Sequence, residues 1–264
     1  MKKYLVIGNP IEHSLSPKLH NFWIEKHNIN AIYEKQKLNK NDLQNLILKV
    51  REKKLHGINV TVPFKKSIIP YLDQLTPQAQ STESVNTIYL KNDKILGHNT
   101  DIDGFELGVK NLKFDVTGKK IFILGAGGVV PSIIFALKKM NASEIIISNR
   151  TREKAENLKT LFEDLIIVDW GKLPNFDMII NATSIGLNKI DKLNLDFSEV
   201  GINKFFYDVI YNPSETNFLK TAKNLDHITE NGKLMFIYQA SAAFKIWHEI
   251  QPKINDEVIN FLDL

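Results

Sequence analysis

A lysine, a carboxylate, an amide and a hydroxyl stand just beyond the ends of predicted strands in the first part of the chain. The segment INVTVPFKK places Thr61 and Lys65 at the carboxyl end of one strand, where open α/β sheets bind ligands. VNT and HNTD bracket a predicted hairpin and contribute Asn86 and Asp101. Together these groups could bind a hydroxylated molecule and exchange a proton with it, as redox chemistry on a polyol requires.

Each of these residues also has a purely structural interpretation. Lys65 could be one of many surface lysines, and Asn86 could be a turn residue. Asp101 could be the N-cap of a helix that begins at Asp103. It is their joint occurrence beside a nucleotide-binding pattern that favours a catalytic site.

That nucleotide-binding pattern is LGAGGVV, residues 124–130, which follows a predicted strand and opens a helix. A glycine turn in this context can bring backbone N–H groups against a pyrophosphate. Val130 stands where Gly or Ala is usual, which predicts a slightly wider approach of helix and strand. Pro131 is tolerated because the first helical turn needs no donor there. A tight turn that binds nothing is the structural alternative.

The next predicted strand ends in SNRT, residues 148–151, about 20 residues past the glycines. NAD-selective sites usually place Asp or Glu here, whereas this chain has Asn149, Arg150 and Thr151. A guanidinium and a hydroxyl can bind a 2′-phosphate through charge-assisted hydrogen bonds, so the pattern predicts NADP. A surface pair with a glutamate would explain Arg152 but explains Arg150 poorly.

The loop GNPIEHSLSP carries two serines, Ser14 and Ser16, just before Pro17. One interpretation is a helix start, with Ser16 as the N-cap and Pro17 at the first helical position. The other is an anion site, because a helix N-terminus offers free N–H groups that hydroxyls would complement. The loop itself leaves both interpretations open.

Two successive patterns of strands and helices must position these residues. Alternation of this kind predicts βαβ units and largely parallel sheets, hence an α/β fold in two domains with a boundary near residues 101–105. MFIYQASAAFKIWHEI near the C-terminus predicts a helix. The first pattern comprises strands at 4–8, 31–38 and 58–62, helices between them, and a hairpin at 87–99 around Asn92 and Asp93. The second pattern begins at residue 119.

The composition excludes several classes of function. The 264 residues contain no cysteine, which rules out disulfides, thiolate metal sites and thiol catalysis, and the seven histidines occur singly. A net charge of +4 without an arginine-rich strip does not indicate nucleic-acid binding. No apolar run approaches the ~20 residues of a membrane span, and Asn9 and Pro10 end the N-terminal apolar run too early for a signal peptide. We therefore expect a cytoplasmic protein.

The order of the motifs along nearly the whole chain resembles that of the shikimate dehydrogenase family. The resemblance rests on GNPIEHSLSP with His20, NVTVPFK, VNT, NTDIDGF, GAGG, NRTREK, NATSIG, YNPSET and GKLMFIYQA. It implies reversible NADPH-dependent reduction of 3-dehydroshikimate to shikimate, in the pathway to chorismate and the aromatic amino acids. It also implies an N-terminal α/β substrate domain (1–102), a Rossmann-like NADP-binding domain (103–234) and a C-terminal helical segment (235–264) that returns to the first domain. The active site would lie in the cleft between the two domains.

The resemblance also implies roles for individual residues. Lys65 and Asp101 would take part in proton transfer without a metal, and which of them is the formal acid is left open. Ser14 and Ser16 would hold the substrate carboxylate, which answers the question that their loop raises. Contacts to the rest of the substrate are implied for Thr61, Asn86, Asp101, Tyr211 and Gln239. Contacts to NADP are implied for Gly125, Ala126, Gly127, Gly128, Val129, Asn149, Arg150, Thr151, Lys154, Thr183, Val209 and Gly232.

The chain departs from the family pattern at three places. Glu83 and Ser84 replace small residues before VNT, and GAGGVVP is bulkier than the usual glycine turn. Leu187 stands where methionine is common. Because none of these positions is a proposed proton-transfer residue, the departures bear on cofactor affinity more than on activity.

Two other functions compete with this one. A quinate/shikimate dehydrogenase would accept an extra hydroxyl and often prefers NAD, and the Ser14/Ser16 pair and NRT argue against it. A non-catalytic NADP-binding regulatory protein would not need both Lys65 and Asp101. The expected partner is a small-molecule substrate rather than nucleic acid or membrane, and the chain is expected to be a monomer or a homodimer.

Overall fold

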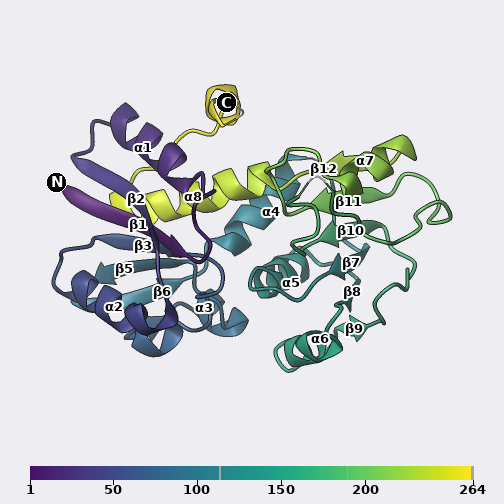
Figure 1. The fold of residues 1–264 in the computed structure, drawn as a ribbon, viewed down its shortest axis with the longest axis horizontal. Coiled ribbons are helices and arrows are strands. Elements are labelled where there is room, and N and C mark those ends of the chain that lie inside the picture. The colour runs from purple at the N-terminus through teal and green to yellow at the C-terminus, as the bar shows by residue number, and fades with distance from the viewer. Residues whose placement is uncertain (113, 189, 263–264) are drawn as a thin grey trace. The chain divides into compact units, whose positions relative to one another are not determined.

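Two sheets of six strands each organise the part of the chain that the structure describes. The computed structural model describes residues 1–112, 114–188 and 190–262. The chain divides into one unit of Met1–Gly104 with Ile237–Leu264 and a second unit of Phe105–Phe236 (Figure 1). The predicted α/β fold with two units is confirmed.

The sheet of the first unit is mixed. Its strands are β1 (Lys2–Gly8), β2 (Ala31–Lys37), β3 (Gly57–Val60), β4 (Gln74–Leu75), β5 (Thr87–Lys91) and β6 (Lys94–His98). They lie in the order β2-β1-β3-β5-β6-β4, with β1 parallel to β2 and β3, and β5 antiparallel to β3 and β6. The predicted hairpin is confirmed, because Asn92 and Asp93 adopt φ of 51° and 58°, the left-handed pair that a two-residue turn needs.

Helices cover both faces of this sheet. The helical segments are α1 (Ser16–Lys26), a 3₁₀ turn (Lys40–Asp42), α2 (Leu43–Arg51), a 3₁₀ turn (Ile69–Tyr71), α3 (Pro77–Thr82), α8 (Lys233–His248) and α9 (Asp256–Phe261). Leu5 and Ile7 of β1 point to the core that includes α2, whereas Tyr4, one residue out of phase, lies 5.1 Å from the Trp247 ring of α8. Gly57 allows this contact, since a Cβ there would lie 2.3 Å from the Trp247 indole nitrogen. The late helix α8 therefore packs on a sheet built from the first hundred residues.

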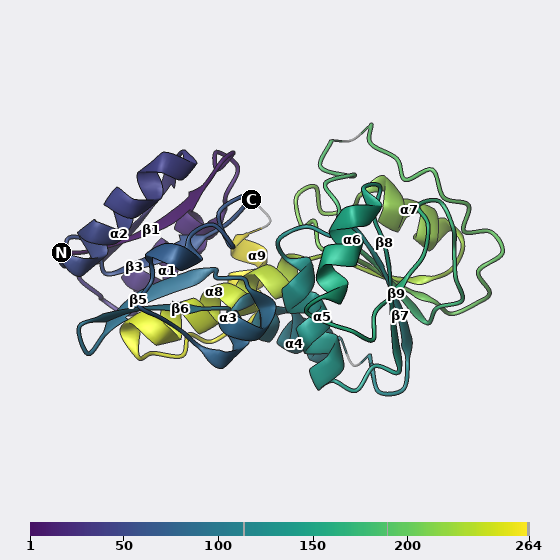
Figure 2. The ribbon, with the colours of Figure 1, turned by 90° about the horizontal axis from the view of Figure 1, so that it is seen from below.

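The second unit is built on a fully parallel sheet. Its strands are β7 (Lys120–Leu124), β8 (Glu144–Ser148), β9 (Ile166–Ile167), β10 (Met178–Asn181), β11 (Phe205–Asp208) and β12 (Ile228–Glu230), in the order β12-β11-β10-β7-β8-β9. The helices are α4 (Asp101–Asn111), α5 (Val130–Lys139), α6 (Arg152–Lys159) and α7 (Asn217–Asn224). Figure 2 shows α5 and α6 on one side of the strands and α7 on the other.

The direction of winding of the second sheet reverses beside β7. The chain runs outward from β7 to β8 and β9, and then crosses back to β10 on the other side of β7. Open α/β sheets bind ligands at the carboxyl ends of the strands beside such a reversal, which is where LGAGG and NATS lie. Among the residues described, no helix is long and apolar enough to cross a membrane.

Candidate functional site

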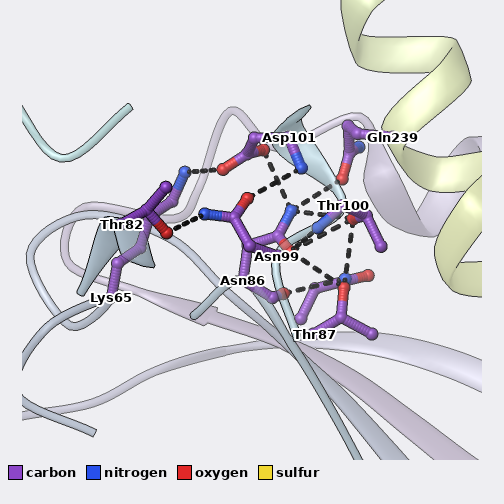
Figure 3. Close-up of polar contacts among 9 residues, drawn as sticks. Lys65, Thr82, Asn86, Thr87, Asn99, Thr100, Asp101 and Gln239 are labelled. Carbon is purple, nitrogen blue, oxygen red and sulfur yellow. Dashed lines mark hydrogen bonds and ion pairs between the residues drawn. The ribbon is translucent and has the colours of Figure 1, made fainter. Parts of the chain in front are cut away.

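The centre of the candidate site is an ion pair between Lys65 and Asp101. Lys65 lies in the turn after β3, and Asp101 is the first residue of α4. The Lys65 Nζ and Asp101 Oδ2 atoms are 2.5 Å apart, and the two side chains are only 11% and 9% exposed (Figure 3). Lys65 is therefore not a solvated surface lysine. The N-cap interpretation of Asp101 is wrong as well, because α4 begins at Asp101 and not at Asp103.

Asn86 holds the second oxygen of that carboxylate. Its Nδ2 atom donates to Asp101 Oδ1 at 2.9 Å and to Gln239 Oε1 of α8 at 3.5 Å. The structure thus brings Lys65, Asn86, Asp101 and Gln239 into one polar cluster of the first unit. Asn86 is buried within a hydrogen-bond network, so its interpretation as a simple turn residue is wrong.

Three buried residues that the sequence analysis did not select orient Asn86. Its side-chain oxygen accepts from the Thr100 backbone N–H at 2.7 Å and from Thr87 Oγ1 at 3.0 Å. Asn59 Nδ2 donates to the Asn86 carbonyl at 3.0 Å. All three are polar residues inside motifs quoted above, one or two positions from a selected residue, and that proximity was the available signal. Because the Asn86 oxygen is occupied, its NH₂ group must face Asp101.

Asn99 fixes the start of α4. Its Oδ1 accepts from the Asp101 backbone N–H at 3.1 Å, and its Nδ2 donates to Thr82 Oγ1 at 3.0 Å. The carboxylate of Asp101 is therefore held through its backbone as well as through its two oxygens. The cluster presents an ammonium, a carboxylate and two amides, which can donate a proton and bind hydroxyls.

The capping interpretation of the two serines in the opening loop is wrong. Ser16 is not the N-cap of α1: the cap position is Leu15, and no side chain caps the helix. Instead, Ser14 Oγ accepts from the Ser16 backbone N–H at 3.3 Å. The Ser16 hydroxyl bonds the buried Tyr33 phenol, whose pKa is raised well above its usual value by burial, against the smaller opposite effect of that bond. The Ser14 hydroxyl thus uses one of its two acceptor lone pairs, and its O–H group can still act as a donor.

Thr61 lies at the same edge of the sheet as this loop. Its backbone N–H donates to the Ile7 carbonyl at 2.9 Å, and Asn9 N–H donates to Val62 at 3.0 Å. The segments that follow β1 and β3 therefore run side by side. A Cβ on Gly8 would lie 2.6 Å from the Thr61 methyl carbon, so Gly8 leaves the space that Thr61 fills.

In the second unit, the glycine turn has the conformation that a nucleotide site needs. Gly125 has φ of +108°, and a Cβ there would lie 2.8 Å from the Ala182 carbonyl oxygen. Gly127 and Gly128 are exposed, and a Cβ on Gly127 would meet nothing closer than 3.9 Å. The turn leads into α5, whose N-terminal end is favourable for a phosphate.

The SNRT segment presents one guanidinium without a partner among the described residues. Arg152 bonds Asp169 at 2.6 Å and Glu156 at 3.1 Å, as the surface-pair interpretation of this residue required. Arg150 is exposed, and no described side chain pairs with it. Asn149 Nδ2 donates to the Thr151 carbonyl at 2.7 Å and thereby shapes the turn. Lys154 lies in the first turn of α6 and is exposed.

The remaining predicted cofactor positions follow β10, β11 and β12. Thr183 follows β10, and its hydroxyl donates to Asn181 Oδ1 at 2.7 Å. A Cβ on Gly232 would lie 2.0 Å from the Val209 carbonyl oxygen, so only glycine permits this approach. Tyr211 belongs to this unit, and its ring stacks on Phe236 at 4.6 Å. The free guanidinium and the open glycine turn fit NADP, since no acidic side chain occupies residues 149–151.

Comparisons with known proteins agree with these features. Residues 6–88 match the model of the shikimate dehydrogenase substrate binding domain, and residues 106–201 match that of shikimate / quinate 5-dehydrogenase. The shikimate dehydrogenase (NADP(+)) of Pelagibacter ubique is 57% identical over 263 residues, which cover 100% of this chain and 99% of that protein.

Solved structures show the same likeness. A shikimate dehydrogenase from Aquifex aeolicus matches with a TM-score of 0.87 and 35% identity over 98% of this chain and 96% of that one. The Thermus thermophilus shikimate 5-dehydrogenase in complex with NADP(H) and shikimate matches with a TM-score of 0.90 and 29% identity, covering 100% of this chain and 99% of that one.

Proposed function

Because this chain belongs to the shikimate dehydrogenase family, we propose that its Lys65–Asp101 pair carries the proton transfer of the family's reaction. The chain is an NADP-dependent shikimate dehydrogenase, an oxidoreductase of the shikimate pathway. It catalyses the reversible reduction of 3-dehydroshikimate to shikimate. The observation that carries the proposal is the 2.5 Å contact between Lys65 Nζ and Asp101 Oδ2 in a nearly buried setting.

Bound NADPH supplies the hydride that the substrate ketone carbon receives. The ketone oxygen becomes an alkoxide as this happens, and Lys65 is placed to stabilise that charge and to donate a proton from its ammonium group. Asp101 accepts from Lys65 through one oxygen and from Asn86 through the other, so it orients the ammonium. In the oxidation of shikimate the same groups act in reverse, and the Lys65–Asp101 pair receives the hydroxyl proton.

Substrate recognition follows from the polar groups around this pair. We assign the carboxylate to the hydroxyls of Ser14 and Ser16, which lie at the N-terminus of α1. The amides of Asn86 and Gln239, joined by a hydrogen bond in this structure, are suited to ring hydroxyls. Thr61 and Tyr211 complete the proposed set of substrate contacts.

Cofactor recognition is assigned to the second unit. The exposed Arg150 guanidinium is suited to the 2′-phosphate, and the open glycine turn is suited to the pyrophosphate. The remaining assigned contacts are the predicted residues that follow β8, β10, β11 and β12, together with Lys154 of α6. We further propose that the enzyme works in the cytoplasm, as a monomer or a homodimer.

One assay tests the function and its rivals. The purified protein is mixed with shikimate or quinate and with NADP⁺ or NAD⁺, and the absorbance of the reduced nicotinamide is followed. We expect turnover with shikimate and NADP⁺ to exceed every other combination. Faster turnover with quinate and NAD⁺ would favour the quinate/shikimate dehydrogenase, and none at all would favour a binding protein without activity.

A further inference from the structure

Two buried polar side chains join the ends of neighbouring strands in the second unit. Asn181 is the last residue of β10, Asp208 is the last residue of β11, and the two are directly paired in register. Both are 0% exposed. Asn181 Nδ2 donates to the two carboxylate oxygens of Asp208 at 3.1 Å each. Neither residue is among the proposed substrate or cofactor contacts.

Asn181 shapes the segment that carries Thr183. Its Oδ1 atom accepts from the Thr183 backbone N–H at 3.2 Å and from the Thr183 hydroxyl at 2.7 Å. Its Nδ2 atom also donates to the Ile185 carbonyl at 3.0 Å. The Thr183 oxygen in turn accepts from Ile185 N–H at 3.0 Å. The amide of Asn181 therefore determines the course of this turn.

Asp208 shapes the segment that carries Val209. Its Oδ1 accepts from the Ile210 backbone N–H at 3.0 Å, and its Oδ2 accepts from Thr216 Oγ1 at 2.6 Å. Thr216 is the N-cap of α7, so Asp208 also anchors the start of that helix. Val209 lies between these anchors, with its backbone N–H donating to the Asn181 carbonyl at 3.0 Å.

The charged Asp208 carboxylate is energetically unfavourable at this buried position. No cation among the described residues pairs with Asp208, and burial raises its pKa to about 6, against the opposing effects of its hydrogen bonds to Thr216, Ile210 and Asn181. The nearby acidic groups are the buried Tyr207 phenol and the half-buried Glu230 carboxyl, and neither supplies a positive charge. An unpaired buried charge carries a large desolvation penalty. What the carboxylate provides in return is two acceptor oxygens for donors from two different segments.

We infer that Asp208, acting through Asn181, is a positioning residue for NADP binding: together they hold the Thr183 and Val209 segments in the conformation that receives the cofactor. This inference rests on the proposed cofactor role of Thr183 and Val209. It makes the binding of NADP depend on a residue that does not touch it.

Direct titration of the full-length protein with NADP⁺ by calorimetry tests the inference without turnover. Asp208→Ala removes both acceptor oxygens, and we expect the Kd for NADP⁺ to rise about tenfold, the weakening that one or two lost hydrogen bonds would cause. Asp208→Asn keeps one acceptor oxygen and should raise the Kd by a smaller factor. The matched control is Glu106→Gln, a buried acid of the same unit held by Lys110 and Lys139, which should lower the Tm and leave the Kd unchanged.

The titrations can overturn the proposed positioning role of Asp208. A rise of less than about threefold for a folded Asp208→Ala, or an equal rise for Glu106→Gln, overturns the inference, since the residue would then act on stability alone. If Asp208→Ala does not fold, Asp208→Asn is the test. A rise of less than about twofold in its Kd for NADP⁺ then overturns the inference. Wild-type protein that binds NADP⁺ but does not oxidise shikimate would refute the proposed function while leaving this test intact.

Discussion

Replacing Lys65 by methionine is the most direct test of the proposed mechanism. Methionine keeps an unbranched side chain of similar length and removes the ammonium that lies 2.5 Å from Asp101. We expect kcat to fall by roughly 10³-fold or more, since proton donation and charge stabilisation are lost together. The KM for shikimate should change only several-fold, because the Ser14, Ser16 and Gln239 contacts do not depend on the ammonium. That split indicates an interaction made chiefly in the transition state.

The structure also predicts the effect of this variant on stability. Asp101 is 9% exposed and would lose its cation, and removing one partner of a buried pair costs on the order of 3 kcal/mol. The Tm of Lys65→Met should therefore fall by several degrees. The double variant Lys65→Met/Asp101→Asn removes the unpaired charge, so it should recover part of the lost Tm and none of the lost turnover.

Steady-state kinetics, calorimetric titration with shikimate and thermal unfolding are the measurements. The control is Lys66→Met, the neighbouring lysine, whose ion pair with Glu83 is 77% and 45% exposed and should matter little for turnover or stability. A Lys65→Met enzyme that keeps a tenth or more of wild-type turnover would remove Lys65 from the mechanism. Asp101 would then be left as the proton-transfer group.

Three further predictions concern single residues. Arg150→Ala should lower the NADP-over-NAD selectivity on the order of 10–100-fold in binding titrations, because the lost bond is charge-assisted, and equal losses for both cofactors would contradict this. Ser14→Ala should raise the KM for shikimate and lower the Tm slightly, because Ser14 Oγ also accepts from the Ser16 N–H, and an unaltered KM would leave only the structural role. Burial lowers the pKa of His20 to about 3, so His20 stabilises the fold above its unfolded pKa and this contribution is lost as the pH falls from about 6.5 toward 3. Denaturant unfolding measures the free energy of unfolding at pH 7 and at pH 5. Between these two pH values, His20→Phe should lose about 2 kcal/mol less of this free energy than wild type does. Equal losses in the two proteins would count against a neutral buried imidazole.

Local sequence signals predicted local structure well. The hairpin at Asn92 and Asp93 follows from residues that tolerate positive φ, and the glycine turn after β7 follows from a position where a Cβ would collide with the Ala182 carbonyl. The same signals selected Lys65 and Asp101, since polar residues after strand ends collect at one edge of a sheet. The assignment of substrate and cofactor contacts remains a prediction.

Tertiary contacts override the local sequence signal at both predicted N-caps, Ser16 and Asp101. A serine before proline is a strong N-cap pattern, yet Ser16 is already helical, and its hydroxyl bonds Tyr33 of β2 instead. Asp101 likewise lies inside the first turn of α4 because its carboxylate is held by Lys65 and Asn86. In both cases a partner distant in sequence competes for the side chain that a local cap would use.

Short-range patterns in the sequence specify most of the strands and helices, the glycine positions and the types of group available for catalysis, because these depend on neighbours within a few residues. Which groups meet depends on how the folded chain packs. Gln239 and Asn86 are 153 positions apart in the sequence. Their side chains meet because α8 packs on the first sheet, with Trp247 against Gly57. Asn181 faces Asp208 because β10 and β11 pair in one register. Such contacts result from packing of whole faces and strands, which no short stretch of sequence encodes.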